Sequence, residues 1–257
     1  MLKLARGMLT EVQYRVLRTF FPRNAATDNH VGEPRSSRLR VLLGDELLKR
    51  VVGKTVVDFG CGEGYEAIEM AACGATKVIG VDIRDEVLSI ARRNAQNAGV
   101  AEWCEFTTSA PPGAADVIIS IDAFEHFGNP AEILKIMDRL LKPRGEVLIS
   151  FGPTWLHPMG GHTFSVFPWA HLVFSEDALI RWRADFKSDG ATRFSEVAGG
   201  LNQMTIARFE RLIQESPFRA ECIATVPIRR LKRLHNQLTR EFTTAIVRCR
   251  LVKRTRA

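Results

Sequence analysis

A glycine-rich turn separates an apolar stretch from an expected helix in the sequence VVDFGCGEGYEAIEMA, residues 56–71. Its spacing, Gly60-x-Gly62-x-Gly64, lets the backbone come close to a nucleoside. A dinucleotide fingerprint requires a further glycine where this chain has Tyr65. Asp58 lies just before the turn, so a pyrophosphate bound there would meet a like charge. Two like charges about 4 Å apart repel by roughly 4 kcal/mol at an effective dielectric constant near 20. The turn therefore disfavours a pyrophosphate and favours a nucleoside cofactor without phosphate.

S-adenosylmethionine fits this description, because it offers an amino-acid end, a sulfonium, a ribose and an adenine. Asp58 suits the ammonium of the methionyl part. Asp82 ends the stretch VIGVD, 20 residues beyond Gly62, and its carboxylate can accept hydrogen bonds from both ribose hydroxyls. Asp82 alone would also fit a nicotinamide cofactor. The preference for S-adenosylmethionine over such a cofactor therefore depends on the glycine turn and on Asp58.

The elements that must position these residues alternate between apolar strands and helix-period segments, which predicts an α/β fold with a parallel sheet. We expect strands over residues 55–59, 77–83, 104–108, 116–122, 145–151, 219–226 and 240–252. We expect helices over about 38–52, 64–73 and 85–99, and two more that Asn129 and Thr205 cap. Residues 151–200 are expected to be irregular.

Four motifs occur in order, VVDFGCGEG, VIGVDI, DVIISIDAFEHF and LLKPRGEVLIS. Together they resemble class I S-adenosylmethionine-dependent methyltransferases, in particular the branch that acts on small molecules. The resemblance covers residues 40–150 strongly, and the last two expected strands match the family's closing antiparallel hairpin more loosely. It implies a Rossmann-like fold with a seven-stranded, mostly parallel sheet, helices on both faces, and the cofactor at the carboxyl ends of the first two strands.

The resemblance also implies a role for each matching position. The methionyl part would be held at the turn by Asp58, Gly60, Cys61 and Gly62. Asp82 would hold the ribose, and Ile83 would pack on the adenine. The segment near the sulfonium would be Ser120, Ile121 and Asp122. The family often has an acid near the adenine amino group, whereas TTSAPPG places Thr108 or Ser109 there, so we expect a hydroxyl or a backbone group to replace it.

The stretch IDAFEHF follows the fourth expected strand and places Glu125 and His126 beside the reaction centre. Methyl transfer to a hydroxyl requires alignment of the reactants and removal of a proton. His126 is the candidate base because an imidazole titrates near neutral pH. Alternatively, the two residues merely begin a helix and orient the cofactor.

Residues 151–200 form an aromatic-rich insertion after the fifth strand and are the expected substrate cover. The candidate acceptor-binding residues in it are His157, His162, Trp169 and His171. Many of the aromatic residues could instead form the insertion's own core. The histidine spacing, H-x4-H-x8-H, matches no familiar metal-ligand pattern, so we predict no metal ion. Some O-methylating relatives use a divalent ion near the fourth strand, so Glu125 and His126 leave that possibility open.

The two ends of the chain are basic, and residues 228–257 carry ten Lys/Arg against one Glu. Residues 1–36 are predicted to be a helical extension or lid on a methyltransferase domain at 37–257. The apolar stripe of its helix would be Leu4, Met8, Leu9, Val12, Val16 and Phe20, which also allows weak attachment to a membrane surface. We find no transmembrane segment or signal peptide, and the scattered cysteines are typical of a cytoplasmic protein.

Two functions follow from these features. The first is methylation of a small-molecule acceptor, most simply at a hydroxyl of a sugar, a phenol or quinone, or another biosynthetic intermediate. No NPPY-like run marks a nucleobase acceptor, so nucleic acid is not expected as the partner. The alternative is an RNA- or protein-directed methyltransferase that uses the basic C-terminal segment. A protein that binds the cofactor without transferring a methyl group is a third hypothesis. The sequence does not predict an oligomeric state.

Overall fold

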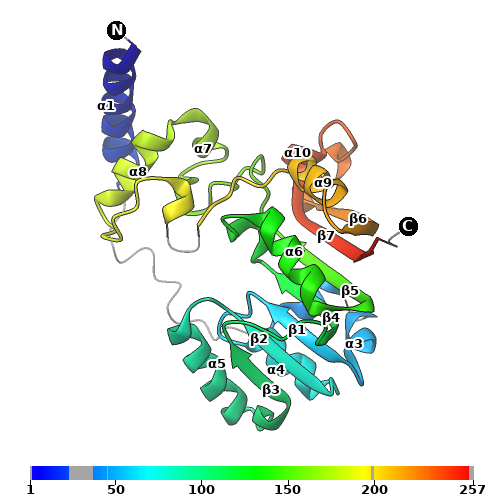
Figure 1. The fold of residues 1–257 in the computed structure, drawn as a ribbon. Coiled ribbons are helices and arrows are strands. Elements are labelled where there is room, and N and C mark those ends of the chain that lie inside the picture. The colour runs from blue at the N-terminus through cyan, green and yellow to red at the C-terminus, as the bar shows by residue number, and fades with distance from the viewer. Residues whose placement is uncertain (1, 23–36, 45, 198–199, 255–257) are drawn as a thin grey trace.

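The computed structural model describes residues 2–22, 37–44, 46–197 and 200–254 of the chain. Its centre is a seven-stranded sheet in the order β3-β2-β1-β4-β5-β7-β6 (Figure 1). The strands are β1 (Thr55–Phe59), β2 (Lys77–Val81), β3 (Cys104–Thr107), β4 (Ala115–Ile121), β5 (Leu141–Phe151), β6 (Phe218–Pro227) and β7 (Thr244–Lys253). Only β7 runs antiparallel to its neighbours. The predicted mostly parallel sheet with a closing antiparallel hairpin is confirmed.

Helices cover both faces of this sheet because alternate strand residues point to opposite sides. Val57 joins one core cluster with Phe209, and Val56 joins the other with Met70. One face is covered by α6 (Pro130–Leu140) and α9 (Ile206–Gln214). The other is covered by α2 (Leu39–Leu43), α3 (Glu46–Val51), α4 (Tyr65–Ala72) and α5 (Asp85–Asn97). The two helix layers bury both faces of the sheet and so position the strand ends relative to one another.

Helix ends follow local signals in the sequence where such signals exist. The Asn129 side chain accepts a hydrogen bond from the N–H of Glu132 at 3.2 Å, and Thr205 caps α9 through the N–H of Arg208 at 3.1 Å. Both caps were predicted. The helix expected over 38–52 is instead two short helices, because Gly44 adopts a φ of 85° between them. The last strand begins at residue 244 because the preceding residues form α10 (Arg240–Thr243).

The insertion is more regular than its sequence suggested, because it contains α7 (Ala170–Val173) and α8 (Glu176–Ala184). It packs with the N-terminal helix α1 (Leu2–Phe20), which lies beside α8 (Figure 1). Their shared core includes Leu17, Phe164 and Trp182. The Tyr14 hydroxyl donates to Asp185 at 3.0 Å, and the Trp182 indole N–H donates to the Phe21 carbonyl, also at 3.0 Å. The N-terminal helix and the insertion therefore form one packed unit, whereas the predicted division at residue 36 and the lid role stay predictions.

The face by which α1 packs differs from the predicted one. Among its described side chains, residues 7–20, Tyr14 and Leu17 are the buried ones. The described part of the predicted stripe is exposed, with fractions between 37% and 71% for Met8, Leu9, Val12, Val16 and Phe20, and the Leu4 side chain lies outside the described part of the structure. The prediction failed because it counted apolar residues and ignored Tyr14, whose ring is buried while its hydroxyl is hydrogen-bonded. Among the described residues, no helix combines the length and the apolar character needed to span a bilayer.

A substitution at Phe124 tests the packing that supports the segment after β4. Its side chain is fully buried, and its ring lies 5.2 Å from that of Phe209 and 5.8 Å from that of Phe151, between centroids. Phe124→Ala should lower the free energy of unfolding by about 3–5 kcal/mol, because it leaves a cavity in the core. Urea unfolding followed by circular dichroism measures the change.

The matched control is Phe20→Ala, at a phenylalanine that is 71% exposed. We expect it to change the free energy of unfolding by no more than about 0.5 kcal/mol. Equal losses in the two variants would contradict the assignment of the core.

Candidate active site

The glycine turn is formed by backbone conformations that favour glycine. Gly60 has a φ of 86° and Gly62 a φ of 51°. A Cβ added at Gly60 would lie 2.7 Å from the Cβ of Ala123, whereas one at Gly62 would meet nothing within 4 Å. The turn after β1 therefore packs directly against the segment after β4, and its Gly62 side is open to a ligand.

Asp58 has an incomplete set of partners under this turn. Its carboxyl is only 2% exposed and accepts a hydrogen bond from the N–H of Ala67, but its Oδ2 has no partner among the described residues. Burial raises the pKa of this carboxyl well above its usual range, and the neighbouring Glu66 raises it further. An ammonium group would supply the missing donor and the missing positive charge. Asp58 therefore fits the methionyl end of S-adenosylmethionine.

Asp82 is held in place by the turn and by its own neighbour. One carboxylate oxygen accepts from the N–H of Gly62 at 3.1 Å, and the Arg84 guanidinium donates to both oxygens at 3.0 Å. Burial alone would raise the pKa of Asp82, but the hydrogen bonds from Arg84 outweigh it and the pKa lies below the usual range. Arg84 is largely exposed, so it can yield its place to ribose hydroxyls. The adjacent Ile83 is 89% exposed, which leaves its side chain free to cover an adenine.

The other residues predicted to bind the cofactor lie at the same edge of the sheet. Cys61 is 4% exposed, and burial raises the pKa of its thiol. Ser109 is exposed, and its N–H donates to the Thr107 hydroxyl at 3.4 Å. Ser120 is fully buried, and Ile121 is 9% exposed. Their roles stay predictions.

Asp122 directly follows β4 and has a left-handed backbone conformation, with a φ of 46°. Its carboxylate forms an ion pair with Arg38. Burial raises the pKa of Asp122, while the Arg38 charge opposes this shift. Arg38 lies before the first strand, 84 residues from Asp122, and its place in the site had no signal in the sequence.

Glu125 and His126 lie in a short 3₁₀ helix, Phe124–His126, which Ala123 separates from Asp122. Glu125 is 3% exposed and accepts from the Gly152 N–H at 3.3 Å, and burial raises its pKa to about 8. The His126 Nδ1 lies 2.7 Å from the Gly200 carbonyl, which can only accept, so Nδ1 carries a proton and Nε2 holds the lone pair when the ring is neutral. The ring of His162 lies 5.2 Å from that of His126, between centroids. Among the residues predicted to bind the substrate, His162 therefore lies next to the predicted catalytic pair, Glu125 and His126.

The remaining insertion residues serve the insertion itself. His171 is 4% exposed, with its Nδ1 3.1 Å from the Ser165 hydroxyl and its Nε2 2.7 Å from the Trp155 carbonyl. Both nitrogens are engaged, so we no longer propose His171 as a substrate ligand. His157 accepts from the Met159 N–H, and burial lowers its pKa to about 4.

Trp169 donates its indole N–H to the Leu156 carbonyl at 2.9 Å and is half-buried. The roles predicted for Trp169 and His157 toward a substrate stay predictions.

A cavity of about 290 Å³ opens beside His126. The insertion contributes Glu176, Arg193 and Ser195 to its wall, and the segment before α9 contributes Asn202. Asn202 is fixed by donating to the carbonyls of Phe124 and Phe127 at 2.8 and 3.0 Å. The rest of the lining is Gly128, Leu201, Gln203 and Arg208. Apart from His126 and the segment 151–200, none of this lining was predicted, because no local pattern marks it.

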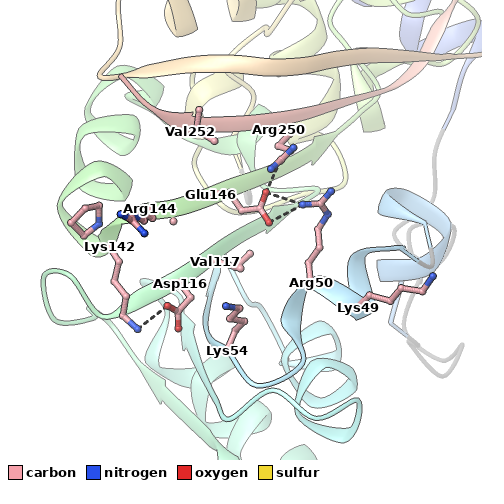
Figure 2. A pocket seen from close by; sticks show the side chains of 12 residues that line it. Lys49, Arg50, Lys54, Asp116, Val117, Lys142, Arg144, Glu146, Arg250 and Val252 are labelled. Carbon is pink, nitrogen blue, oxygen red and sulfur yellow. Dashed lines mark hydrogen bonds and ion pairs between the residues drawn. The ribbon is translucent and has the colours of Figure 1, made fainter. Parts of the chain in front are cut away.

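A second hollow, of about 670 Å³, lies at the amino ends of the parallel strands (Figure 2). Arg50 and Arg250 both reach Glu146, and Lys142 pairs with Asp116 at 2.9 Å. Basic side chains dominate its lining, which also includes Lys49, Lys54 and Arg144. The glycine turn lies at the carboxyl ends of these strands, so the hollow is separate from the cofactor site.

Comparison with known proteins indicates the same class of protein as the four sequence motifs. A family model described as a methyltransferase domain matches residues 31–200, more than half of the chain. The chain is 41% identical over 114 residues to the ubiquinone biosynthesis O-methyltransferase of Sodalis glossinidius, a match covering 41% of this chain and 45% of that protein. It is 42% identical over 101 residues to the ribosomal protein L11 methyltransferase of Vibrio campbellii, covering 38% of this chain and 33% of that protein. The chain thus spans less than half the length of these curated relatives.

The solved structure of a methyltransferase from Aquifex aeolicus, dependent on S-adenosylmethionine, has a TM-score of 0.53 and 15% identity. The match covers 89% of this chain and 98% of that chain, and it shows the fold. The chain belongs to the methyltransferase-domain family, with the class I fold that the sequence predicted. The predicted cofactor, S-adenosylmethionine, is the one this class uses.

Asp82 gives a direct test of the cofactor position. Asp82→Asn should weaken binding of S-adenosylmethionine about tenfold or more, because a hydrogen bond to a charged group contributes about 1.5–3 kcal/mol. Isothermal titration calorimetry measures the dissociation constant. Asp85→Asn, at the exposed start of α5, is the control and should leave binding within about twofold. A dissociation constant that is unchanged in Asp82→Asn would place the ribose elsewhere.

Asp58 should make stability depend on pH. In the unfolded chain this carboxyl ionises near its ordinary pKa of 3.8, whereas in the folded protein its pKa is raised. Ionisation therefore favours the unfolded chain progressively as the pH rises above about 4. Asp58→Asn removes this effect, so its free energy of unfolding relative to the wild type should increase between pH 4 and pH 7. Urea unfolding at several pH values measures the difference, and a difference that decreases would contradict the raised pKa.

Proposed function

We propose that this protein transfers a methyl group from S-adenosylmethionine to a hydroxyl of a small-molecule acceptor. The observation that carries the proposal is the cavity beside His126. It adjoins the segment that packs on the glycine turn, because Ala123 contacts Gly60 and His126 follows three residues later. An acceptor in this cavity would lie next to the predicted position of the sulfonium.

The residues around the cavity suit the removal of a proton from a hydroxyl. When bound, S-adenosylmethionine supplies an electrophilic methyl group. His126 offers the lone pair of Nε2 because its Nδ1–H is held by the Gly200 carbonyl. Glu125 lies beside it, and burial raises the pKa of Glu125 to about 8, so this carboxyl can change its protonation near neutral pH. We assign them the role of lowering the barrier to ionisation of the acceptor hydroxyl.

The relatives support a small acceptor with a hydroxyl. Several of the curated relatives are named as ubiquinone biosynthesis O-methyltransferases, at 35–41% identity over about 40% of this chain. A phenolic hydroxyl is therefore the first acceptor class to test. The insertion supplies part of the cavity wall, which agrees with its proposed role as the substrate cover.

A protein or RNA acceptor is the second candidate, and the similarity to a ribosomal protein L11 methyltransferase favours it. Its support in this chain was the basic C-terminal segment. Many of those charges are engaged within the fold, since Arg240 pairs with Glu210 at 2.7 Å, Arg250 with Glu146 at 2.5 Å and Lys253 with Asp138 at 3.3 Å. This segment therefore offers less free charge than its sequence suggests.

The test is formation of S-adenosylhomocysteine with a panel of catechols, other phenols and sugars. The wild type should methylate a phenolic member of the panel, and His126→Ala should lower kcat by roughly 10²–10⁴-fold. Methylation of ribosomal protein or RNA alone would favour the second candidate. Cofactor binding without any transfer would support the third hypothesis.

The control for that assay is His235→Ala. The His235 ring lies between the Thr225 and Thr243 hydroxyls, at 3.0 and 2.8 Å, far along the chain from the cavity lining. Its kcat should stay within about twofold of the wild type. A kcat for His126→Ala as high as for His235→Ala would remove His126 from the mechanism.

A further inference from the structure

We propose that Glu125, His126 and His162 bind one divalent transition-metal ion, such as Zn²⁺, Co²⁺ or Mn²⁺. One ligand atom from each of these residues lies within 4.8 Å of the others. The histidine spacing within the insertion predicted no metal ion, and the proposed site uses only one of these three histidines, His162. The set combines one insertion histidine with two residues that follow β4, so only the fold brings it together.

Both histidines are oriented as metal-binding histidines usually are. The Nδ1 of His126 lies 2.7 Å from the Gly200 carbonyl, and the Nδ1 of His162 lies 3.1 Å from the Gly160 carbonyl. A carbonyl oxygen accepts and does not donate, so each Nδ1 carries the proton and each Nε2 keeps its lone pair. Hydrogen bonding of the second ring nitrogen to a backbone carbonyl is the common support for an imidazole that ligates a metal.

Glu125 provides the independent observation. Its side chain is 3% exposed, and one oxygen accepts from the Gly152 N–H at 3.3 Å. The other oxygen, Oε2, has no hydrogen-bond partner within the described part of the chain. A buried carboxylate oxygen without a partner is unfavourable unless a proton or a cation satisfies it. A metal ion beside two imidazole nitrogens would do so.

The ligand atoms need to move only a little to close on an ion. Metal–nitrogen bonds of about 2.1 Å in a tetrahedral site place neighbouring ligand atoms roughly 3.4 Å apart. His162 begins the short 3₁₀ helix His162–Phe164 in a left-handed conformation, with a φ of 52°. Because His162 belongs to the insertion and the other two ligands follow β4, a bound ion would connect the insertion to the segment after β4.

The donor set selects the kind of ion. Two imidazoles with one carboxylate suit Zn²⁺, Mn²⁺, Fe²⁺ and Co²⁺, whereas Mg²⁺ and Ca²⁺ prefer oxygen ligands alone. Three protein ligands leave at least one coordination position open to another molecule. The open position would accept an oxygen of the acceptor.

The catalytic consequence rests on the proposed function. The ion would bind the acceptor hydroxyl and lower its pKa, so that the proton leaves to water. The acceptor oxygen then forms its bond to the methyl carbon as the carbon–sulfur bond breaks, and the electron pair of that bond stays on sulfur. In this arrangement His126 acts as a ligand to the ion and not as the base.

The experiment is a titration of the chelator-treated full chain with Co²⁺, followed by calorimetry and by visible absorption. All proteins carry Cys222→Ser, because Cys222 is an exposed thiol that could bind the probe. We expect one ion per chain. Glu125→Gln and His162→Ala should each weaken binding at least tenfold, whereas His235→Ala should not change it.

Two measurements exclude unfolding of the variant as the cause of weaker Co²⁺ binding. The midpoint of thermal unfolding and the affinity for S-adenosylmethionine should stay near those of the parent protein in at least one of the two weakened variants, which shows that it is folded. Absence of Co²⁺ binding at 100 μM protein, or equal binding by His162→Ala and the parent, would overturn the metal site.

Failure of the metal site and failure of the proposed function are distinguishable. Transfer to a phenol at an unchanged rate in the chelator-treated protein, with no ion bound, would keep the function and overturn the metal site. One ion bound through these three residues, with no transfer to any small acceptor, would keep the metal site and overturn the function.

Discussion

The packing of Gly60 against Ala123 is the contact on which the rest of the site depends. Any side chain at position 60 would place its Cβ 2.7 Å from the Cβ of Ala123, so a glycine is required there. β1 and β4 are parallel neighbours, and their carboxyl ends therefore meet at one edge of the sheet. The contact closes the gap between the two segments that follow these strands. It brings the glycine turn, which follows Asp58, against the segment that leads to Glu125 and His126.

Two buried carboxylates at this edge are poorly satisfied by the protein itself. Asp58 and Glu125 are 2% and 3% exposed, and each has one oxygen without a partner among the described residues. Burial raises the pKa of both, to about 8 for Glu125. Buried carboxylate oxygens without a partner are unfavourable, and groups with strongly shifted pKa values are candidates for a functional site. An ammonium at Asp58 and a metal ion at Glu125 would satisfy both.

The sheet and the cofactor turn could be predicted because their signals are local. Apolar runs mark the strands, and Asn129 and Thr205 form the predicted caps. The packing of the insertion could not be predicted in this way. The buried face of α1 was missed because Tyr14 is satisfied by Asp185, 171 residues away. Asn202 and His162 reach the site through similarly long-range packing, which no periodicity reveals.

Thermal unfolding of the purified protein with S-adenosylmethionine, S-adenosylhomocysteine and NADH shows directly which cofactor the glycine turn binds. A ligand at 100 times its dissociation constant stabilises the folded state by about 2.7 kcal/mol, which should raise the midpoint by several degrees. We expect the midpoint to rise with the two sulfur nucleosides and not with NADH. A rise with NADH alone would contradict the assignment of the glycine turn and of every residue placed around it.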